Sequence, residues 1–178
     1  MLREIILPET EPALEWIMGR PVQKVSPQRR HALLQGELSR RFADWARGRG
    51  EVGTEWRFRI APPGEELRPL VPDVAYLSYA RLGDATDDAL EAPIVPPNVA
   101  IEVRSPEDRQ TLIDHKIGVY QAAGTDLVIV VDPNERTVLA HDSSGVRTYR
   151  PGDIFTHPVL PDFVLAIAEL FDVLRRPR

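Results

Sequence analysis

Two carboxylates stand at the ends of short apolar runs, where a charge is costly to place. Glu102 lies in the run Val99 to Val103, and Asp73 opens the run Val74 to Leu77. Side chains alternate between the two faces of a strand, so Glu102 shares one face with Arg104 while the valines point the other way. A buried charge needs a partner, and two carboxylates at strand ends can hold a hard divalent cation such as Mg²⁺. The pattern predicts either a paired charge cluster or a metal site.

A helix is predicted directly after the Glu102 strand. Ser105 is a suitable N-cap, Pro106 suits the first helical position, and Asp108 stands three residues after the cap, as in a capping box. Gly124 is the expected C-cap.

This helix carries a lysine on its apolar side. At about 100° per residue, Lys116 and Arg109 fall inside one arc. The apolar members of that arc are Leu112, Ile113, Val119, Tyr120 and Ala123. Long cationic side chains commonly extend along the edge of a buried face, which is one interpretation. The other is that Lys116 points from the helix toward Glu102.

These residues resemble the proline-aspartate and glutamate-any-lysine signature of the PD-(D/E)XK nuclease superfamily. Within it, the chain is most similar to the small bacterial Uma-type restriction endonucleases, a family often described only as a domain of unknown function. The matching motifs cover nearly the whole chain in the expected order: Leu14-Glu15-Trp16-Ile17-Met18-Gly19-Arg20, Pro72-Asp73-Val74-Ala75, Ile101-Glu102-Val103-Arg104-Ser105-Pro106, Lys116 with Tyr120 and Gly124, Val130-Val131-Asp132-Pro133, Leu160-Pro161-Asp162-Phe163 and Leu170-Phe171.

The resemblance implies a restriction-endonuclease-like fold that hydrolyses phosphodiester bonds, with DNA as the expected partner. It implies that Asp73, Glu102 and the backbone carbonyl of Val103 bind one or two Mg²⁺ or Mn²⁺ ions, which activate a water and neutralise phosphate charge. Arg104 stands where the signature has lysine. A guanidinium cannot lose a proton at ordinary pH, so Arg104 can hold a phosphate or a carboxylate but cannot act as a base. The superfamily tolerates a lysine on the neighbouring helix, so Lys116 is the expected replacement.

The remaining pattern predicts one α/β domain over residues 1–178, with a mixed central sheet flanked by helices and an N-terminal hairpin. The hairpin is expected over 14–25, turning at Gly19-Arg20, and a helix capped by Ser26 runs from Pro27 to Arg47. A strand is expected over 54–61, paired with the Asp73 strand across the turn 62–66. The other expected elements are a loop over 81–97 that has room for a short helical turn, a strand buried on both faces over 127–131, a hairpin over 137–149, a short strand over 163–165 and a closing helix over 167–174.

The first long helix carries His31 and Glu37. In the superfamily an acid of the first helix sometimes joins the site, so Glu37 is a candidate, although most exposed helical glutamates have no chemical role.

Composition narrows the class of protein. The chain has no Cys, which excludes a disulfide scaffold or a thiolate zinc site and fits a cytoplasmic protein; no apolar run approaches a membrane span. The net charge is −5, but residues 20–59 hold ten basic and four acidic residues, so this block is +6 and the rest of the chain is −11. The basic block is either a surface that follows a phosphate backbone or a solvated helix face.

Three hypotheses follow. The first is a metal-dependent endonuclease, supported by the paired carboxylates and Lys116. The second is a catalytically inactive nuclease fold that binds nucleic acid, supported by Arg104 in the place of lysine. The third is a protein-interaction domain in which Asp73, Glu102, Arg104 and Lys116 only pair their charges. A C₂ homodimer is the commonest arrangement for a small cytoplasmic protein and would allow two cuts on a duplex.

Overall fold

A six-stranded mixed sheet forms the centre of the protein. The computed structural model describes residues 3–106 and 108–175. The strands of the sheet are β3 (Gly50–Thr54), β6 (Val74–Ser78), β7 (Val99–Val103), β8 (Leu127–Asp132), β9 (Thr137–Asp142) and β10 (Gly145–Tyr149). They lie in the order β10-β9-β8-β7-β6-β3, with β7 parallel to β8 and each other pair antiparallel. The predicted mixed α/β sheet is confirmed.

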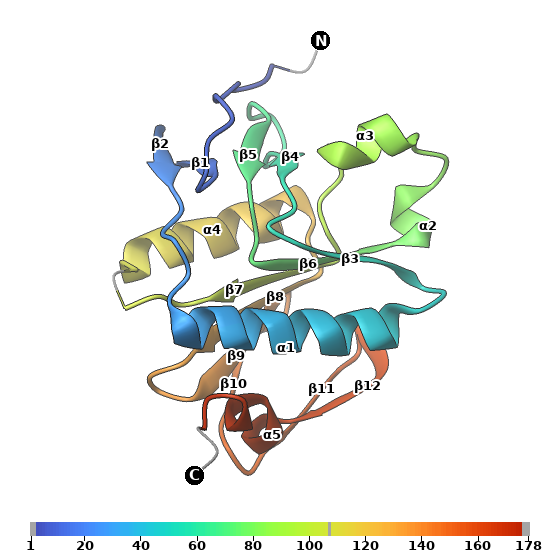
Figure 1. The fold of residues 1–178 in the computed structure, drawn as a ribbon. Coiled ribbons are helices and arrows are strands. Elements are labelled where there is room, and N and C mark those ends of the chain that lie inside the picture. The colour runs from blue at the N-terminus through green and yellow to red at the C-terminus, as the bar shows by residue number, and fades with distance from the viewer. Residues whose placement is uncertain (1–2, 107, 176–178) are drawn as a thin grey trace.

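Three hairpins and five helices cover this sheet in the described part of the chain. The hairpins are β1 (Leu14–Ile17) with β2 (Arg20–Gln23), β4 (Phe58–Ile60) with β5 (Arg68–Leu70), and β11 (Ile154–His157) with β12 (Leu160–Ala166). The helices are α1 (Arg29–Ala46), α2 (Tyr79–Leu82), α3 (Asp87–Glu91), α4 (Gln110–Ala123) and α5 (Ile167–Asp172). Figure 1 shows α4 and the first two hairpins on one side of the sheet, and α1, α5 and the third hairpin on the other. None of these helices is long and apolar enough to cross a membrane.

The sheet separates two hydrophobic cores. In β7, Val99, Ile101 and Val103 pack toward α1 and α5, whereas Ala100 packs toward α4. The same alternation runs through β6 and β8, so both strands are buried on both faces, as predicted for residues 127–131. Glu102 therefore projects into the α4 side of the sheet, where its charge must be matched by side chains from α4 or the hairpins above it.

The prediction of one strand over 54–61 is wrong. Glu55 adopts a left-handed conformation (φ 51°), which breaks the extended chain directly after β3. Of the predicted range, only Thr54 belongs to β3, which pairs with β6 in the main sheet; residues 58–60 form β4, which pairs with β5. Alternating polarity is the same in one long strand and in two short ones, so the pattern could not show the break.

The predicted start of the Lys116 helix at Ser105 is also wrong. Arg109 is extended (φ −80°, ψ 130°), and α4 begins at Gln110. The Asp108 carboxylate accepts the backbone N–H of Ser105 at 2.6 Å, as in a capping box, but here the bond closes a turn before the helix. The predicted C-cap is confirmed, since Gly124 is left-handed (φ 104°).

Gly50 is required for the close pairing of β3 with β6. A Cβ at this position would lie 2.3 Å from the carbonyl oxygen of Leu77 and 2.7 Å from Cα of Ser78. Because backbone atoms cannot move aside cheaply, we expect Gly50→Ala to lower the free energy of unfolding by about 1–3 kcal/mol, measured by urea denaturation. Gly36 on α1 has no atom within 4 Å of such a Cβ, so the control Gly36→Ala should raise stability by about 0.5–1 kcal/mol. Equal losses in both variants would contradict the steric argument.

Candidate metal and phosphodiester site

Asp73 and Glu102 meet at the adjoining ends of β6 and β7. The antiparallel register pairs Val74 with Ile101, so the next positions along it, Asp73 and Glu102, stand opposite each other. Both residues are buried, with 2% of the surface of Asp73 and 4% of that of Glu102 exposed. They line a pocket of about 130 Å³ whose other walls include Glu15, Val22 and Lys24 from the hairpin segment, His31 from α1, and Ile113 and Lys116 from α4. Three separate parts of the chain, the hairpin segment, α1 and α4, therefore enclose the two carboxylates.

Both oxygens of Asp73 are occupied by hydrogen-bond donors. Oδ2 accepts the backbone N–H of Val103 at 2.7 Å and contacts Nε2 of His31 at 3.0 Å. Oδ1 contacts Nζ of Lys24 at 2.7 Å. Burial alone would raise the pKa of Asp73, but the charges and hydrogen bonds of Lys24 and His31 outweigh it and hold the pKa well below its usual range. Asp73 is thus ionised and fixed in orientation.

Glu102 is held by one oxygen and presents the other to the pocket. Oε1 lies 2.7 Å from Nζ of Lys116 and accepts the hydroxyl of Tyr120 at 3.1 Å. Among the described residues, no hydrogen bond falls on Oε2, and Glu102 lines the pocket. Burial raises the pKa of Glu102 to about 7, in spite of the opposing charge of Lys116. The proton occupancy of this carboxyl therefore changes near neutral pH.

Lys116 points toward Glu102, as one of the two interpretations predicted. Its ammonium also contacts both oxygens of Glu15, at 2.8 Å and 3.1 Å. Burial lowers the pKa of Lys116, but the carboxylates of Glu102 and Glu15 more than compensate and raise it. Lys116 is therefore a buried cation between two carboxylates and not a free base.

The chain has two lysines, Lys24 and Lys116, and twenty arginines. The structure brings both lysines to this site, each within 2.8 Å of a buried carboxylate. A lysine ammonium is a compact charge that fits a small pocket between carboxylates, whereas the guanidinium is broad and planar.

Two candidates from the sequence lie outside the cluster. Arg104 follows the end of β7 and directs its guanidinium to Asp132 at 3.2 Å. Glu37 pairs with Arg40 and Arg41 on the outside of α1. Neither residue lines the pocket between Asp73 and Glu102.

Three residues of the cluster, Glu15, Lys24 and His31, were not predicted from the sequence as site residues. Glu15 lies in a matching motif, Lys24 was counted only within the basic block, and His31 was noted only as a member of the first helix. Glu15 could have been singled out, because it is an acid in a strand whose neighbours are apolar. His31 and Lys24 carry no comparable signal, since polar residues are common at such positions.

The donor set suits a hard divalent cation. Mg²⁺ is commonly bound by one or two carboxylates, with water and substrate oxygens completing its shell. Glu102 can supply Oε2, and Asp73 can supply Oδ1 once the Lys24 ammonium, 2.7 Å away, gives up that oxygen. The backbone carbonyl of Val103 is the third candidate ligand, next to the N–H that holds Oδ2 of Asp73. The described residues contain no group of three His, Cys, Asp or Glu side chains arranged around one point, so the protein would supply only part of the shell.

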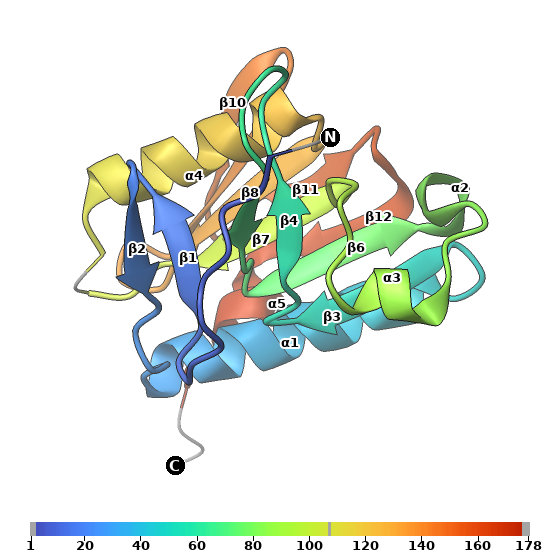
Figure 2. The same ribbon diagram turned by 90° about the horizontal axis from the view of Figure 1, so that it is seen from above.

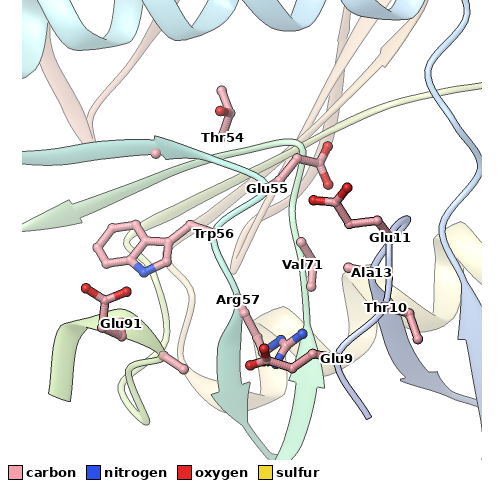
Figure 3. Close-up of a pocket in the computed structure, with 12 residues that line it drawn as sticks. Glu9, Thr10, Glu11, Ala13, Thr54, Glu55, Trp56, Arg57, Val71 and Glu91 are labelled. Atoms are coloured by element: carbon pink, nitrogen blue, oxygen red, sulfur yellow. The ribbon is translucent and has the colours of Figure 1, made fainter. Parts of the chain in front are cut away.

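A larger cavity lies beside this site but is unsuited to the same chemistry. It measures about 740 Å³, and Figure 3 shows carboxylates around it from Glu9, Glu11, Glu55 and Glu91. These charges would repel a phosphate, and Arg57, the one cation among the described residues of its wall, contacts Glu9 at 3.4 Å. Its size reflects an open surface depression and not a catalytic centre.

Comparison with known proteins shows the family and the fold of this chain. The family model Uma2, described as "Putative restriction endonuclease", matches residues 3–168. Among solved structures, a "putative nuclease belonging to DUF820" from Anabaena variabilis ATCC 29413 is similar, with a TM-score of 0.84 and 27% sequence identity over 95% of each chain. No functionally curated protein matches the chain.

Proposed function

Because the chain belongs to the Uma2 family of putative restriction endonucleases, we propose that it is a metal-dependent endonuclease that hydrolyses phosphodiester bonds of DNA. The observation that carries this proposal is the pairing of Asp73 and Glu102 across two strands, with no donor on Oε2 of Glu102 among the described residues and the Lys116 ammonium 2.7 Å from Oε1. A site that served only to pair charges would be expected to give a donor to both oxygens of this buried carboxylate.

In this proposal Asp73, Glu102 and the carbonyl of Val103 hold Mg²⁺ or Mn²⁺. Such an ion lowers the pKa of a bound water and neutralises charge on the phosphate. Lys116 supplies a fixed positive charge beside Glu102. This charge would stabilise the negative charge that develops on a phosphate bound there as the phosphodiester is attacked. The hydroxyl of Tyr120 and the ammonium of Lys116 together fix Oε1, so that Glu102 presents Oε2 in one orientation.

Calorimetric titration of Mn²⁺ into the wild type and into Glu102→Gln tests the proposal, followed by plasmid nicking. The amide keeps the shape of Glu102 and removes its charge. We expect the wild type to bind Mn²⁺ and to nick DNA only with the metal, and the variant to do neither. Absence of Mn²⁺ binding by the wild type at millimolar metal would contradict the proposal and favour a nuclease fold used for binding alone.

Metal affinity should depend on pH through Glu102. Its pKa is raised to about 7, and the proton must leave before the carboxylate can bind a cation. Below pH 7 we therefore expect the Mn²⁺ affinity to fall by up to about tenfold per pH unit, and above pH 8 to be nearly constant. Calorimetry at pH 6, 7 and 8 measures this. An affinity that is equal at the three pH values would show that Glu102 is already ionised at pH 6 or is not a ligand.

The structure divides the basic block into two parts. Its arginines from Arg40 onward pair with acids in the described structure: Arg40 with Glu37 and Asp44, Arg41 with Glu37 and Glu169, Arg47 with Asp44, Arg49 with Asp162, Arg57 with Glu9 and Arg59 with Glu4. Among the described residues, Arg20, Arg29 and Arg30 have no ion pair, and Arg30 donates a hydrogen bond to the amide oxygen of Asn134 at 2.9 Å.

Two of these arginines, Arg29 and Arg30, lie near the site. Arg29 and Arg30 begin α1, next to His31, which lines the pocket. Figure 2 shows that α1 and α4 both start at the same end of the molecule, beside the hairpin β1–β2. A phosphate backbone can therefore meet positive charge at the end of α1 that adjoins Asp73.

We expect Arg29→Gln with Arg30→Gln to weaken DNA binding by about tenfold at low salt and to reduce the slope of log K against log salt by up to about 2. Fluorescence anisotropy with a labelled duplex measures both quantities. The matched control is Arg40→Gln with Arg47→Gln, which removes two arginines already paired with acids and should change affinity less than about twofold. Equal losses in the two double variants would show that the whole helix, and not its first turn, contacts DNA.

A further inference from the structure

Glu15 has a position that the proposed reaction does not yet use. It lies in β1, with 4% of its surface exposed. Its carboxylate accepts the backbone N–H of Val71 at 2.8 Å and contacts the Lys116 ammonium with both oxygens. A buried carboxylate that reaches from a peripheral hairpin to a lysine on α4 is costly to build, so a role in the site is expected.

A difficulty arises when a cation binds Glu102. In the structure, Lys116 lies between two carboxylates, Glu102 on the sheet and Glu15 on the hairpin. A divalent ion bound to Glu102 would neutralise the charge of that carboxylate and would repel the ammonium of Lys116. Lys116 has 5% of its surface exposed, so it could not turn to water instead. Without a second partner it would be a buried charge with no compensation.

We propose that Glu15 is a positioning residue that keeps the Lys116 ammonium beside the site when Glu102 engages a metal ion. This inference rests on the proposed metal-dependent function. It gives the hairpin β1–β2 a role over the pocket: β1 delivers the carboxylate that lets the Lys116 ammonium stay in the wall of a cavity of about 130 Å³ when that cavity holds a metal ion. Glu15 itself would touch neither metal nor substrate.

The test uses the protein labelled with ¹⁵N at lysine, which gives signals from Lys24 and Lys116 alone. A buried, ion-paired ammonium exchanges slowly with water and gives a sharp ¹H–¹⁵N signal, whereas a released one is broadened. With saturating Mg²⁺, we expect the Lys116 signal to persist in the wild type and to vanish in Glu15→Gln. The amide oxygen still accepts the N–H of Val71, so the fold is retained. In the control Glu55→Gln, which alters a carboxylate that pairs with Lys24, the Lys116 signal should persist.

A second arm needs no metal and separates this inference from the proposed function. In Glu102→Ala without metal, Glu15 alone should keep the Lys116 signal sharp, with a thermal melt as the check of folding. If the wild type binds no Mg²⁺, the proposed function fails while this arm still tests the anchoring by Glu15. A Lys116 signal lost in folded Glu102→Ala, or retained in Mg²⁺-saturated Glu15→Gln, overturns the inference.

Kinetics give an independent readout. Because Glu15 is proposed to act through Lys116 and not on DNA, Glu15→Gln should lower kcat for nicking by roughly 10- to 100-fold and leave KM within about twofold. A change confined to KM would contradict a positioning role.

Discussion

Replacing Lys116 with methionine is expected to reduce nicking by about 10²- to 10³-fold, the usual cost of removing one group that stabilises developing negative charge. Methionine fills a similar volume but leaves Glu15 and Glu102 buried without their shared cation. Removal of one partner of a buried ion pair typically costs about 3–5 kcal/mol, so the free energy of unfolding of the variant should fall by that amount at pH 8. Urea denaturation and a nicking assay with Mn²⁺ measure the two effects.

The loss of stability in Lys116→Met should shrink at lower pH. Glu102 already has its pKa raised to about 7 by burial, and removing Lys116 would raise it further. The carboxyl would then become neutral on acidification, and the folded state would gain the proton more readily than the unfolded chain does. Arg109→Met, an exposed change at the N-cap of the same helix, is the control and should alter stability by less than about 0.5 kcal/mol. If the Lys116→Met variant nicked DNA at the wild-type rate, Lys116 would have no role in the mechanism.

Asp73→Asn is expected to abolish nicking and to destabilise the fold, whereas Glu102→Gln should abolish nicking alone. Both oxygens of Asp73 accept from donors, so the amide nitrogen introduced by the substitution would face either Lys24 or the pair Val103 and His31. A donor pointed at a donor leaves buried groups unsatisfied, and removal of the charge leaves Lys24 without its buried partner. We expect a loss of about 3–5 kcal/mol in unfolding free energy.

Glu102 differs because Lys116 and Tyr120, its partners among the described residues, both contact Oε1. In Glu102→Gln the amide oxygen can take that place and the nitrogen can face the pocket, so stability should stay within about 1 kcal/mol of the wild type. Thermal melts and urea denaturation of the two variants at about pH 7.5, above the raised pKa of Glu102, make the comparison. Equal destabilisation of both would show that Oε2 of Glu102 has a structural partner.

The sequence predicted the parts of the protein that depend on neighbours along the chain. Alternation in Val99–Val103 placed Glu102 opposite its apolar neighbours, and the helical arc placed Lys116 on the buried side of α4; both were confirmed. The resemblance to the Uma-type family was confirmed as well, since the family model matches residues 3–168. Element boundaries were less certain: the break at Glu55 and the late start of α4 depend on backbone angles of single residues.

The tertiary structure alone decided which charges meet. Glu15 and Lys116 are 101 positions apart, and Lys24 and Asp73 are 49 apart. Whether such residues touch depends on how the hairpin β1–β2 and α1 pack on the sheet, which no local pattern encodes. The same holds for Arg104: its place in the signature suggested the site, but the chain leaves β7 in a direction that brings its guanidinium to Asp132. Strand and helix periods are properties of short segments, so the sequence determined that Glu102 and Lys116 lie on buried faces of their elements. The partner of a buried charge is set by packing between segments, so only the folded chain determined the site.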